Sequence, residues 1–264
     1  MWKLEEKPFT RPISPLVENV EQIVYFPTDK EENSNGIVSI GWRGPHISQL
    51  KELLALDILF SYLAESSISP LHEHFIDKKS YCNKISYQVQ EYRETYVAIS
   101  FANTQLEHLD KIKTELFDIL ASIVSGRQEL SMNRVNSIIK MKMNELSDKF
   151  EDAPHDTISK ICIGDFLYGN ESDKFEFRAR FAQLNIFESI KNESNAAYWI
   201  HLIDKYFLKS HSVTIIAKPC EKLMKAIGEE DKQRVEERKR NLGKKGLKDL
   251  KTAVENAIDE NDVS

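Results

Sequence analysis

The segment "SPLHEHFID" carries the residue types that a hydrolytic metal centre uses, because His72 and His74 stand on either side of a glutamate. On a helix these two histidines would lie roughly 200° apart around the axis, so they could not face one ion. A helical zinc pair needs a spacing of four, and the residues at that spacing are Ile76 and Lys78. The spacing favours ordinary solvated histidines and leaves metal binding through a strand or loop geometry as the alternative.

Composition limits the classes of function. The 264 residues are 41% hydrophobic and 30% charged, which is typical of a globular chain with one large core or two small ones. The formal net charge of −6 disfavours a nucleic-acid partner, since binding to phosphate backbones is driven by positive charge.

Cysteine usage and hydropathy bear on the compartment. The three cysteines, Cys82, Cys162 and Cys220, are far apart and form no C-x-x-C pair, which fits a reducing environment. The longest apolar run, "LLALDILFSYLA", is too short to cross a bilayer, and "MWKLEEKPFTRP" has no hydrophobic signal core. We expect a soluble intracellular protein, cytoplasmic unless a mitochondrial targeting segment lies upstream.

Hydrophobic periodicity predicts the elements that must position any site. Runs of β-branched and aromatic residues predict a hairpin from "EQIVYFP" and "NGIVSIGWRG", a second hairpin over residues 81–102, and a last strand at "SVTIIAKP". Steps of three and four residues predict helices from near Pro45 to Leu63, over 106–126 with a stop at Gly126, and over 131–150 with Ser131 as N-cap. Two or three further helices cover roughly 155–208, broken at "YGNES" and near Asn192.

The element order predicts an α+β fold: a mainly antiparallel sheet of about five strands covered on one face by helices, followed by a C-terminal helical hairpin. Residues 1–19 form an extended lead-in, residues 20–218 the α/β domain, and residues 219–264 a charged segment with 11 basic and 11 acidic residues. That segment predicts two helices around "NLGKKG", with most side chains in water.

The same order of elements resembles a known family. The resemblance rests on "GIVSIGWRGP" leading into a long helix, on "SSISPLHEHFID" leading into a hairpin, and on the tail with "NLGKKGL". Together they resemble the insulinase/pitrilysin-type (inverzincin) zinc metallopeptidases, in the branch that contains presequence-degrading peptidases. The resemblance runs from about Val20 to about Asn261. It implies a protein of four related α/β domains in two bowl-shaped halves, of which this chain is similar to the non-catalytic second domain plus the helical linker.

The resemblance also implies where the catalytic metal would lie. The family's zinc site is an inverted H-x-x-E-H on a helix of the first domain, with a further glutamate ligand downstream. None of the seven histidines here begins that pattern, and the corresponding helix, "SQLKELLALDILFSYL", contains no histidine. We therefore expect no catalytic residue, no metal and no peptide hydrolysis in this chain alone, with zinc in the first domain of a parent metalloendopeptidase.

In such enzymes a substrate peptide can add to a sheet edge through backbone hydrogen bonds, a mode that tolerates varied sequences. The resemblance implies an anchoring role for the strand at "SYCNKISY". Its predicted anchoring residues are Tyr81, Asn83, Lys84 and Ile85. The alternative is a core strand, with Ile85, Tyr87 and Val89 packed under the helices.

The expected partners are the remaining domains of the parent peptidase and its peptide substrates, with neither nucleic acid nor membrane. An alternative function is a self-standing, catalytically dead subunit that keeps the fold in order to bind protein partners. An H-x-x-E-H in the preceding couple of hundred residues would separate the two. A third hypothesis is a small metal enzyme that uses His72 and His74.

Overall fold

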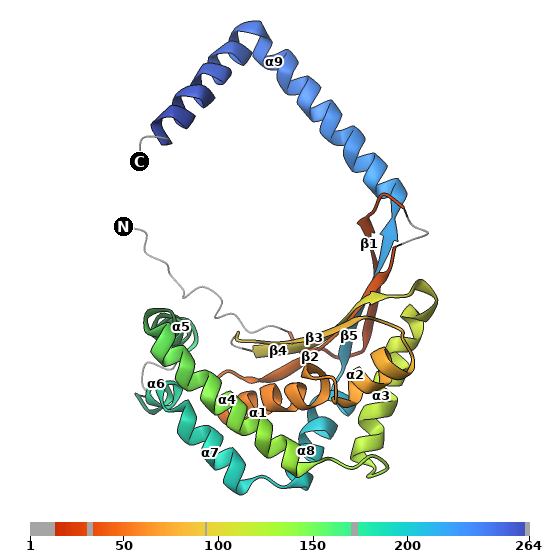
Figure 1. Cartoon of the computed structure of the whole chain (residues 1–264), viewed down its shortest axis with the longest axis vertical. Coiled ribbons are helices and arrows are strands. Elements are labelled where there is room, and N and C mark those ends of the chain that lie inside the picture. The colour runs from red at the N-terminus through yellow and green to blue at the C-terminus, as the bar shows by residue number, and fades with distance from the viewer. Residues whose placement is uncertain (1–13, 31–33, 93, 170–173, 262–264) are drawn as a thin grey trace. The chain divides into compact units, whose positions relative to one another are not determined.

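The computed structural model describes residues 14–30, 34–92, 94–169 and 174–261 (Figure 1). The chain divides into two compact units. The first contains the chain up to Val24 together with Asn35–Lys218, and the second combines Tyr25–Ser34 with the chain from Pro219 onward.

A five-stranded sheet organises the first unit, and its strands are β1 (Val20–Pro27), β2 (Gly36–His46), β3 (Lys84–Gln90), β4 (Glu94–Thr104) and β5 (Ser212–Cys220). The strand order is β1-β5-β2-β4-β3, and β2 pairs with β5 and β4, and β4 with β3, all antiparallel. The predicted hairpin of β3 and β4 is confirmed. The predicted hairpin of β1 and β2 is wrong, because the late strand β5 lies between them and pairs with β2.

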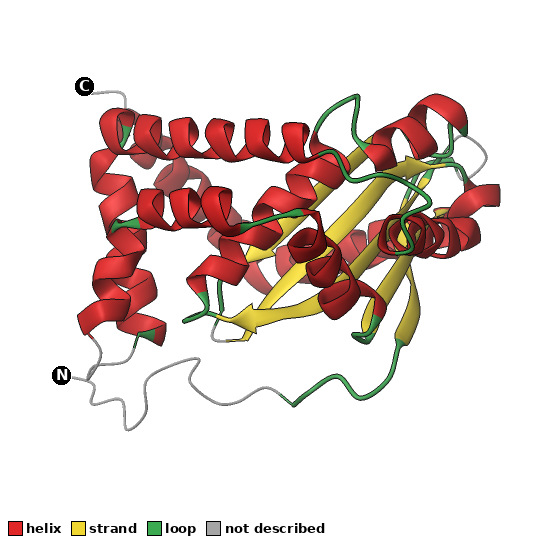
Figure 2. Cartoon of the chain, turned by 90° about the horizontal axis from the view of Figure 1, so that it is seen from below, coloured by secondary structure: helices red, strands yellow, loops and turns green. Residues whose placement is uncertain are grey.

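Alternation along the strands separates two faces of the sheet. On β2, Val38, Ile40 and Trp42 are buried, and on β4 Val97, Ile99 and Phe101 are buried in the same core. The helices of the first unit lie on this face, as seen along the sheet in Figure 1 and from below in Figure 2. The predicted α+β architecture with helices on one face is confirmed.

The first long helix, α1 (Leu50–Phe60), begins later than predicted. Strand β2 continues through Pro45 to His46, which pairs with Glu94, and the Thr95 hydroxyl donates a hydrogen bond to the Pro45 carbonyl at 2.6 Å. Backbone pairing to β4 therefore holds Pro45 in the strand, where the sequence pattern placed it near a helix start. The helix continues as the wider turns of η2 (Ser61–Glu65), whose side chains are mostly buried.

The segment after α1 packs against the core through its apolar side chains. Pro70 opens the short helix α2 (Pro70–His72), which runs on into η3 (Glu73–Lys78). Leu71 and Phe75 are fully buried in the core, with Leu63 beside them in the same cluster.

Two amphipathic helices follow β4. A short turn, η4 (Leu106–His108), leads into α3 (Leu109–Val124), and α4 (Met132–Asp152) follows. The predicted stop at Gly126 is confirmed by a φ of 74°, a conformation that glycine adopts without steric cost. The predicted cap is also confirmed, since the Ser131 hydroxyl accepts a hydrogen bond from the Arg134 amide.

Among the described residues, four helices lie between α4 and β5, where two or three were predicted. They are α5 (Pro154–Tyr168), α6 (Lys174–Phe181), α7 (Gln183–Glu193) and α8 (Ala196–Ile203), and η5 (Asp204–Leu208) extends the last. The predicted break near Asn192 falls between α7 and α8, whereas most of "YGNES" lies outside the described residues.

The second unit contains α9 (Glu221–Asn261). Gly243, with a φ of 61° and a ψ of −177°, interrupts it, so α9 consists of two helical arms, as predicted around "NLGKKG". No described residue of α9 is buried, which agrees with its high charge. Within the described part of the chain, no helix has both the length and the apolar character needed to span a membrane.

Candidate functional site

Helix α1 stands where the resemblance implies the zinc helix, and its acidic side chains are engaged by lysines. The Glu52 carboxylate accepts hydrogen bonds from Lys205, at 2.7 Å, and from the Tyr206 hydroxyl. Asp57 lies 3.2 Å from the ammonium of Lys142. These contacts tie α1 to η5 and to α4. Over the described residues, no group of three side chains is placed to hold a metal ion.

The Lys142 cluster connects α1 and α4 to strand β3. The Lys142 side chain is only 11% exposed and donates a hydrogen bond to the Tyr87 hydroxyl at 3.1 Å. Burial raises the pKa of Tyr87 to about 12, and the nearby Asp57 carboxylate adds to this. Burial alone would lower the pKa of Lys142, but Asp57 and Tyr87 outweigh it and raise that pKa. Lys142 is thus held charged beneath the strand.

Strand β3 lies at one edge of the sheet, with β4 as its single neighbour among the described strands. In an antiparallel edge strand, alternate residues turn their N–H and C=O groups away from the sheet, where another chain can pair with them. Ile85, Tyr87 and Val89 are half-buried against the core, and the residues between them are exposed. The strand therefore has a packed side and a free backbone edge at once.

The chain enters β3 through a polar anchor built on Glu115 of α3. The Tyr81 hydroxyl donates to Glu115 at 3.1 Å, and Nε2 of His74 lies 2.5 Å from the second carboxylate oxygen. The ring of His108 lies against that of Tyr81, with 4.0 Å between their centroids. Burial would raise the pKa of Glu115, but the hydrogen bonds from His74 and Tyr81 outweigh it and lower that pKa.

Backbone strain accompanies this entry to β3. Ser80 and Asn103 have φ values of 52° and 53°, in the left-handed region that non-glycine residues rarely adopt. The Asn103 side chain donates a hydrogen bond to the Asn83 side chain at 2.9 Å, which joins the ends of the two paired strands. Strained residues of this kind persist where surrounding contacts fix them, and they are frequent at ligand sites.

The four predicted anchoring residues lie at the start of this strand but do not share one face. Tyr81 is buried and Ile85 half-buried, both packed with the core cluster. Asn83 and Lys84 are exposed. The pair on the surface is free to contact a ligand, whereas Tyr81 and Ile85 fix the strand from below.

His72 and His74 have separate partners. Nδ1 of His72 lies 3.5 Å from a carboxylate oxygen of Asp77, and His74 contacts Glu115 on α3. Cys82, next to Tyr81, is buried, and burial raises the pKa of its thiol to about 11, so it is a poor nucleophile at neutral pH.

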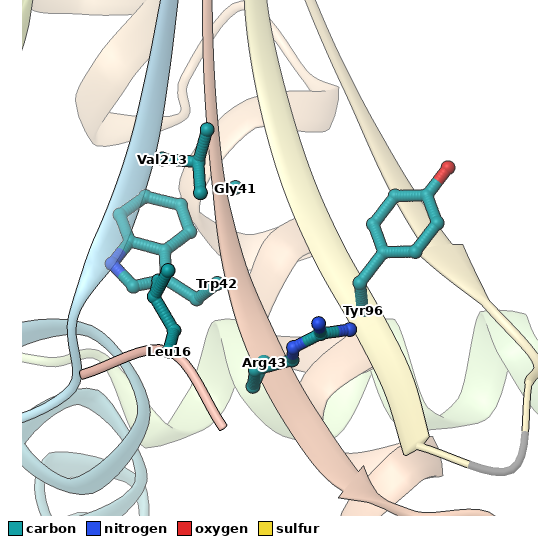
Figure 3. A pocket seen from close by; sticks show the side chains of 6 residues that line it. All are labelled: Leu16, Gly41, Trp42, Arg43, Tyr96 and Val213. Carbon is teal, nitrogen blue, oxygen red and sulfur yellow. The ribbon is translucent and has the colours of Figure 1, made fainter. Parts of the chain in front are cut away.

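The sheet surface opposite the helices, here called the open face, carries a mixture of small, polar and apolar side chains. On β2 and β4 its residues are Ile37, Ser39, Gly41, Arg43, Glu94, Tyr96, Ala98, Ser100 and Ala102, and Ile215 of β5 is also exposed. A pocket of about 240 Å³ opens on this face, lined by Leu16, Gly41, Trp42, Arg43, Tyr96 and Val213 (Figure 3). Figure 3 shows the Arg43 side chain extending over the sheet toward Tyr96.

Leu16 belongs to the lead-in, so a stretch of extended chain already borders this pocket. Asn19 fixes that stretch, because its side-chain oxygen accepts a hydrogen bond from the Ser212 amide at 2.8 Å. Arg43 is half-buried and has neither a hydrogen bond nor an ion pair within the described chain.

Sequence reasoning did not find Glu115, Lys142 or Arg43. Periodicity indicates which face of an element is buried, but it does not indicate which polar residues of distant elements meet. For Arg43 a signal was present: it alternates with Ile40 and Trp42 on β2, so it had to lie on the face away from the core.

Comparison with known proteins agrees with this fold. Residues 3–141 match the family described as the Peptidase M16 inactive domain. The chain belongs to this family. The match extends through α1 and the edge strand β3 to the first half of α4.

Relatives with known sequences are much longer than this chain. An uncharacterised protein of Caenorhabditis elegans is 32% identical over 97% of this chain, and one of Schizosaccharomyces pombe is 23% identical over 88%. The chain spans 25% and 22% of their lengths, respectively.

Solved structures share the fold at low sequence identity. A protease from Helicobacter pylori covers 82% of this chain with a TM-score of 0.59 and 17% identity, and the chain covers 48% of it. The periplasmic protease PqqL from Escherichia coli covers 80%, with a TM-score of 0.57 and 15% identity, and the chain covers 21% of it. A peptidase M16 inactive domain from Pseudomonas fluorescens covers 77%, with a TM-score of 0.54 and 13% identity; 44% of that chain is covered.

Proposed function

We propose that this chain is a non-catalytic, chamber-forming domain with its helical linker, from an insulinase-type zinc metallopeptidase of the presequence-degrading branch. It helps to enclose peptide substrate and anchors it along strand β3. The catalytic zinc belongs to another domain of the longer polypeptide. The remaining domains of that polypeptide are the partners of this chain.

The observation that carries this proposal is the position of β3 at an edge of the sheet, where no further described strand pairs with it. A peptide that adds to such an edge gains main-chain hydrogen bonds whatever its side chains are, so one site serves many sequences. Packing of Ile85, Tyr87 and Val89 against the core keeps the strand straight and in register. A rigid edge lowers the ordering cost of binding.

Side chains beside the edge add selectivity. Lys84 is exposed at the start of the strand, and among the described residues it has no ion-pair partner. It favours an acidic group on the peptide near that end. The side-chain oxygen of Asn83 accepts a hydrogen bond from Asn103, and the NH2 group of Asn83 can donate a hydrogen bond to a carbonyl of a peptide backbone.

Binding of labelled Thr- and Val-rich peptides to the purified chain, followed by fluorescence anisotropy, tests the anchoring role. Two sets of the peptide carry N-methyl groups at alternate positions, one set for each edge of the peptide strand. Methylation of the edge that pairs with β3 should abolish binding, and methylation of the other edge should leave it intact. Equal loss, or no loss, in both sets would exclude pairing to a sheet edge.

A charge reversal provides the matched control. Lys84→Glu should weaken the binding of peptides that have an acidic residue near that end of the strand. Lys160→Glu, which changes an exposed lysine of α5, should leave the binding of these peptides unchanged. Equal effects of the two variants would indicate general electrostatics rather than a site on β3.

Catalysis is tested in the longer polypeptide. Hydrolysis of the same peptides should need an H-x-x-E-H outside this chain and should be lost with a chelator, while this chain alone binds without cleaving. Cleavage by the purified chain would overturn the assignment of a non-catalytic domain.

A further inference from the structure

The pocket on the open face contains a charge without a counter-charge. Arg43 is half-buried on the open face of β2, and no described carboxylate lies within ion-pair distance of it. A guanidinium that loses part of its hydration is stabilised by a carboxylate, which it can bind through two parallel hydrogen bonds. The rest of the pocket is largely apolar, with Leu16, Val213 and Gly41 in its wall.

The register of the sheet connects this pocket to the edge strand. Gln90 of β3 pairs with Tyr96 of β4, and Tyr96 pairs with Arg43 of β2, so the three side chains form one row across the open face. Two strand spacings separate Gln90 from Arg43, about 10 Å in all. The ring of Tyr92 stacks on that of Tyr96, with 5.9 Å between centroids, and extends the row toward the turn between β3 and β4.

We propose that the Arg43 pocket is a second subsite for the anchored peptide and binds a carboxylate, either an acidic side chain or the C-terminal group. This inference rests on the proposed function. A peptide paired to the outer edge of β3 lies one further strand spacing from Arg43, so it must cover about 14 Å after it turns over the open face beside Gln90, which needs about four residues. The site therefore selects peptides with a carboxylate about four residues beyond the paired segment.

Charge complementarity favours this occupant over an apolar one. A purely apolar ligand would bury Arg43 further without a partner, which is costly. The small neighbours on the open face, Gly41 and Ala98, allow a peptide backbone to approach the sheet closely.

A walking-glutamate series tests the subsite. In an uncharged peptide that binds the chain, a single Glu is moved along the sequence, with Gln at the same positions as control. The peptide with Glu at one particular position should bind about tenfold more tightly than the other peptides. Arg43→Gln should remove this advantage and leave the affinities of the other peptides unchanged. Arg238→Gln, an exposed arginine of α9, should change nothing.

The outcomes separate the two proposals. If no uncharged parent peptide binds the chain, the proposed anchoring function fails. If all positions bind equally, or Arg43→Gln leaves the maximum in place, anchoring stands and the Arg43 subsite is wrong.

A small probe examines the pocket without the edge strand. N-acetyl-leucine should shift the NMR signals of Arg43 Nε–H and of the Gly41 amide, and N-acetyl-leucinamide should not. Equal shifts from both compounds would contradict carboxylate recognition. A concentration-dependent dimer that is lost in Arg43→Gln would assign the pocket to a second copy of the chain and would also overturn the proposal.

Discussion

The two faces of the sheet are built from the same strands but carry different chemistry. On β4, Val97, Ile99 and Phe101 are almost completely buried under the helices, while Ala98 and Ser100 alternate with them on the open face. The covered face contains the apolar area that stabilises the fold. The open face and the free edge of β3 contribute little to that core, so their residues are available for recognition. Substitutions at neighbouring positions should therefore have very different effects.

The largest difference is expected between Phe101 and Ala98. Phe101→Ala removes a fully buried ring that packs edge-on against Phe75, and should lower the free energy of unfolding by about 3–5 kcal/mol. Ala98→Ser adds a hydroxyl on the open face and should change the free energy of unfolding by less than about 0.5 kcal/mol. Urea unfolding followed by circular dichroism measures both. Similar losses would mean that the open face is also part of the core.

Charged residues provide a second contrast. Lys142→Met leaves the Asp57 carboxylate and the Tyr87 hydroxyl without their shared partner beneath β3, and should cost about 1–3 kcal/mol of unfolding free energy. Arg43→Met removes a cation that has no described partner, so stability should stay the same or rise slightly.

A double-mutant cycle sharpens this contrast. If the stability lost in Lys142→Met arises because the Asp57 carboxylate is left unpaired, adding Asp57→Leu should restore part of the lost free energy of unfolding. Additive losses in the double variant would instead assign the effect to packing of the lysine stem.

Local patterns were sufficient to predict much of the covered face. Alternation marked Ile85, Tyr87 and Val89 as the packed side of the edge strand, and the steps of three and four residues marked the buried side of α3. The glycine stop at Gly126 and the cap at Ser131 also follow from short-range chemistry.

Non-local pairing was the main source of error. The sequence run after β1 looks like a hairpin arm, but β5 arrives late in the chain and takes the place beside β2. Pro45 is held in β2 by Thr95, a residue of another strand. Neither the insertion of β5 nor the contact from Thr95 can be predicted from a sequence window of ten or twenty residues.

The candidate site was located only in part. The family resemblance pointed to the edge strand, where Asn83 and Lys84 are exposed, and its anchoring role stays a prediction. The anchor below it depends on Glu115, and the pocket beside it on Arg43, which meet their neighbours only in three dimensions.

The anchor predicts a pH dependence of smaller size. Hydrogen bonds from His74 and Tyr81 lower the pKa of Glu115 below its ordinary value of 4.5, so the folded state binds this proton less readily than the unfolded state does. The stabilisation is complete above about 4.5 and is lost as the pH falls through the lower, folded-state pKa. Glu115→Gln should cost about 1 kcal/mol at pH 7 and should remove this part of the acid dependence.

Unfolding of wild type and Glu115→Gln at pH 7 and at pH 3 measures the effect. The difference between the two proteins should shrink at the lower pH. A constant difference would show that the anchor acts through shape alone. Glu107→Gln is the control, since Glu107 is largely exposed and its partner His108 is its neighbour in sequence.

The smallest effect is expected from the polar pair on the open face. The hydroxyls of Ser39 and Ser100 lie 2.8 Å apart across β2 and β4. Both residues are half-buried, so water can replace a lost partner, and each single change to alanine should cost about 0.5 kcal/mol or less. The double change should be no worse than either single one, because it removes both polar groups together. A loss of 2 kcal/mol or more, roughly that of an unsatisfied buried hydroxyl, would mean that this face is shielded from water and would place part of the core there.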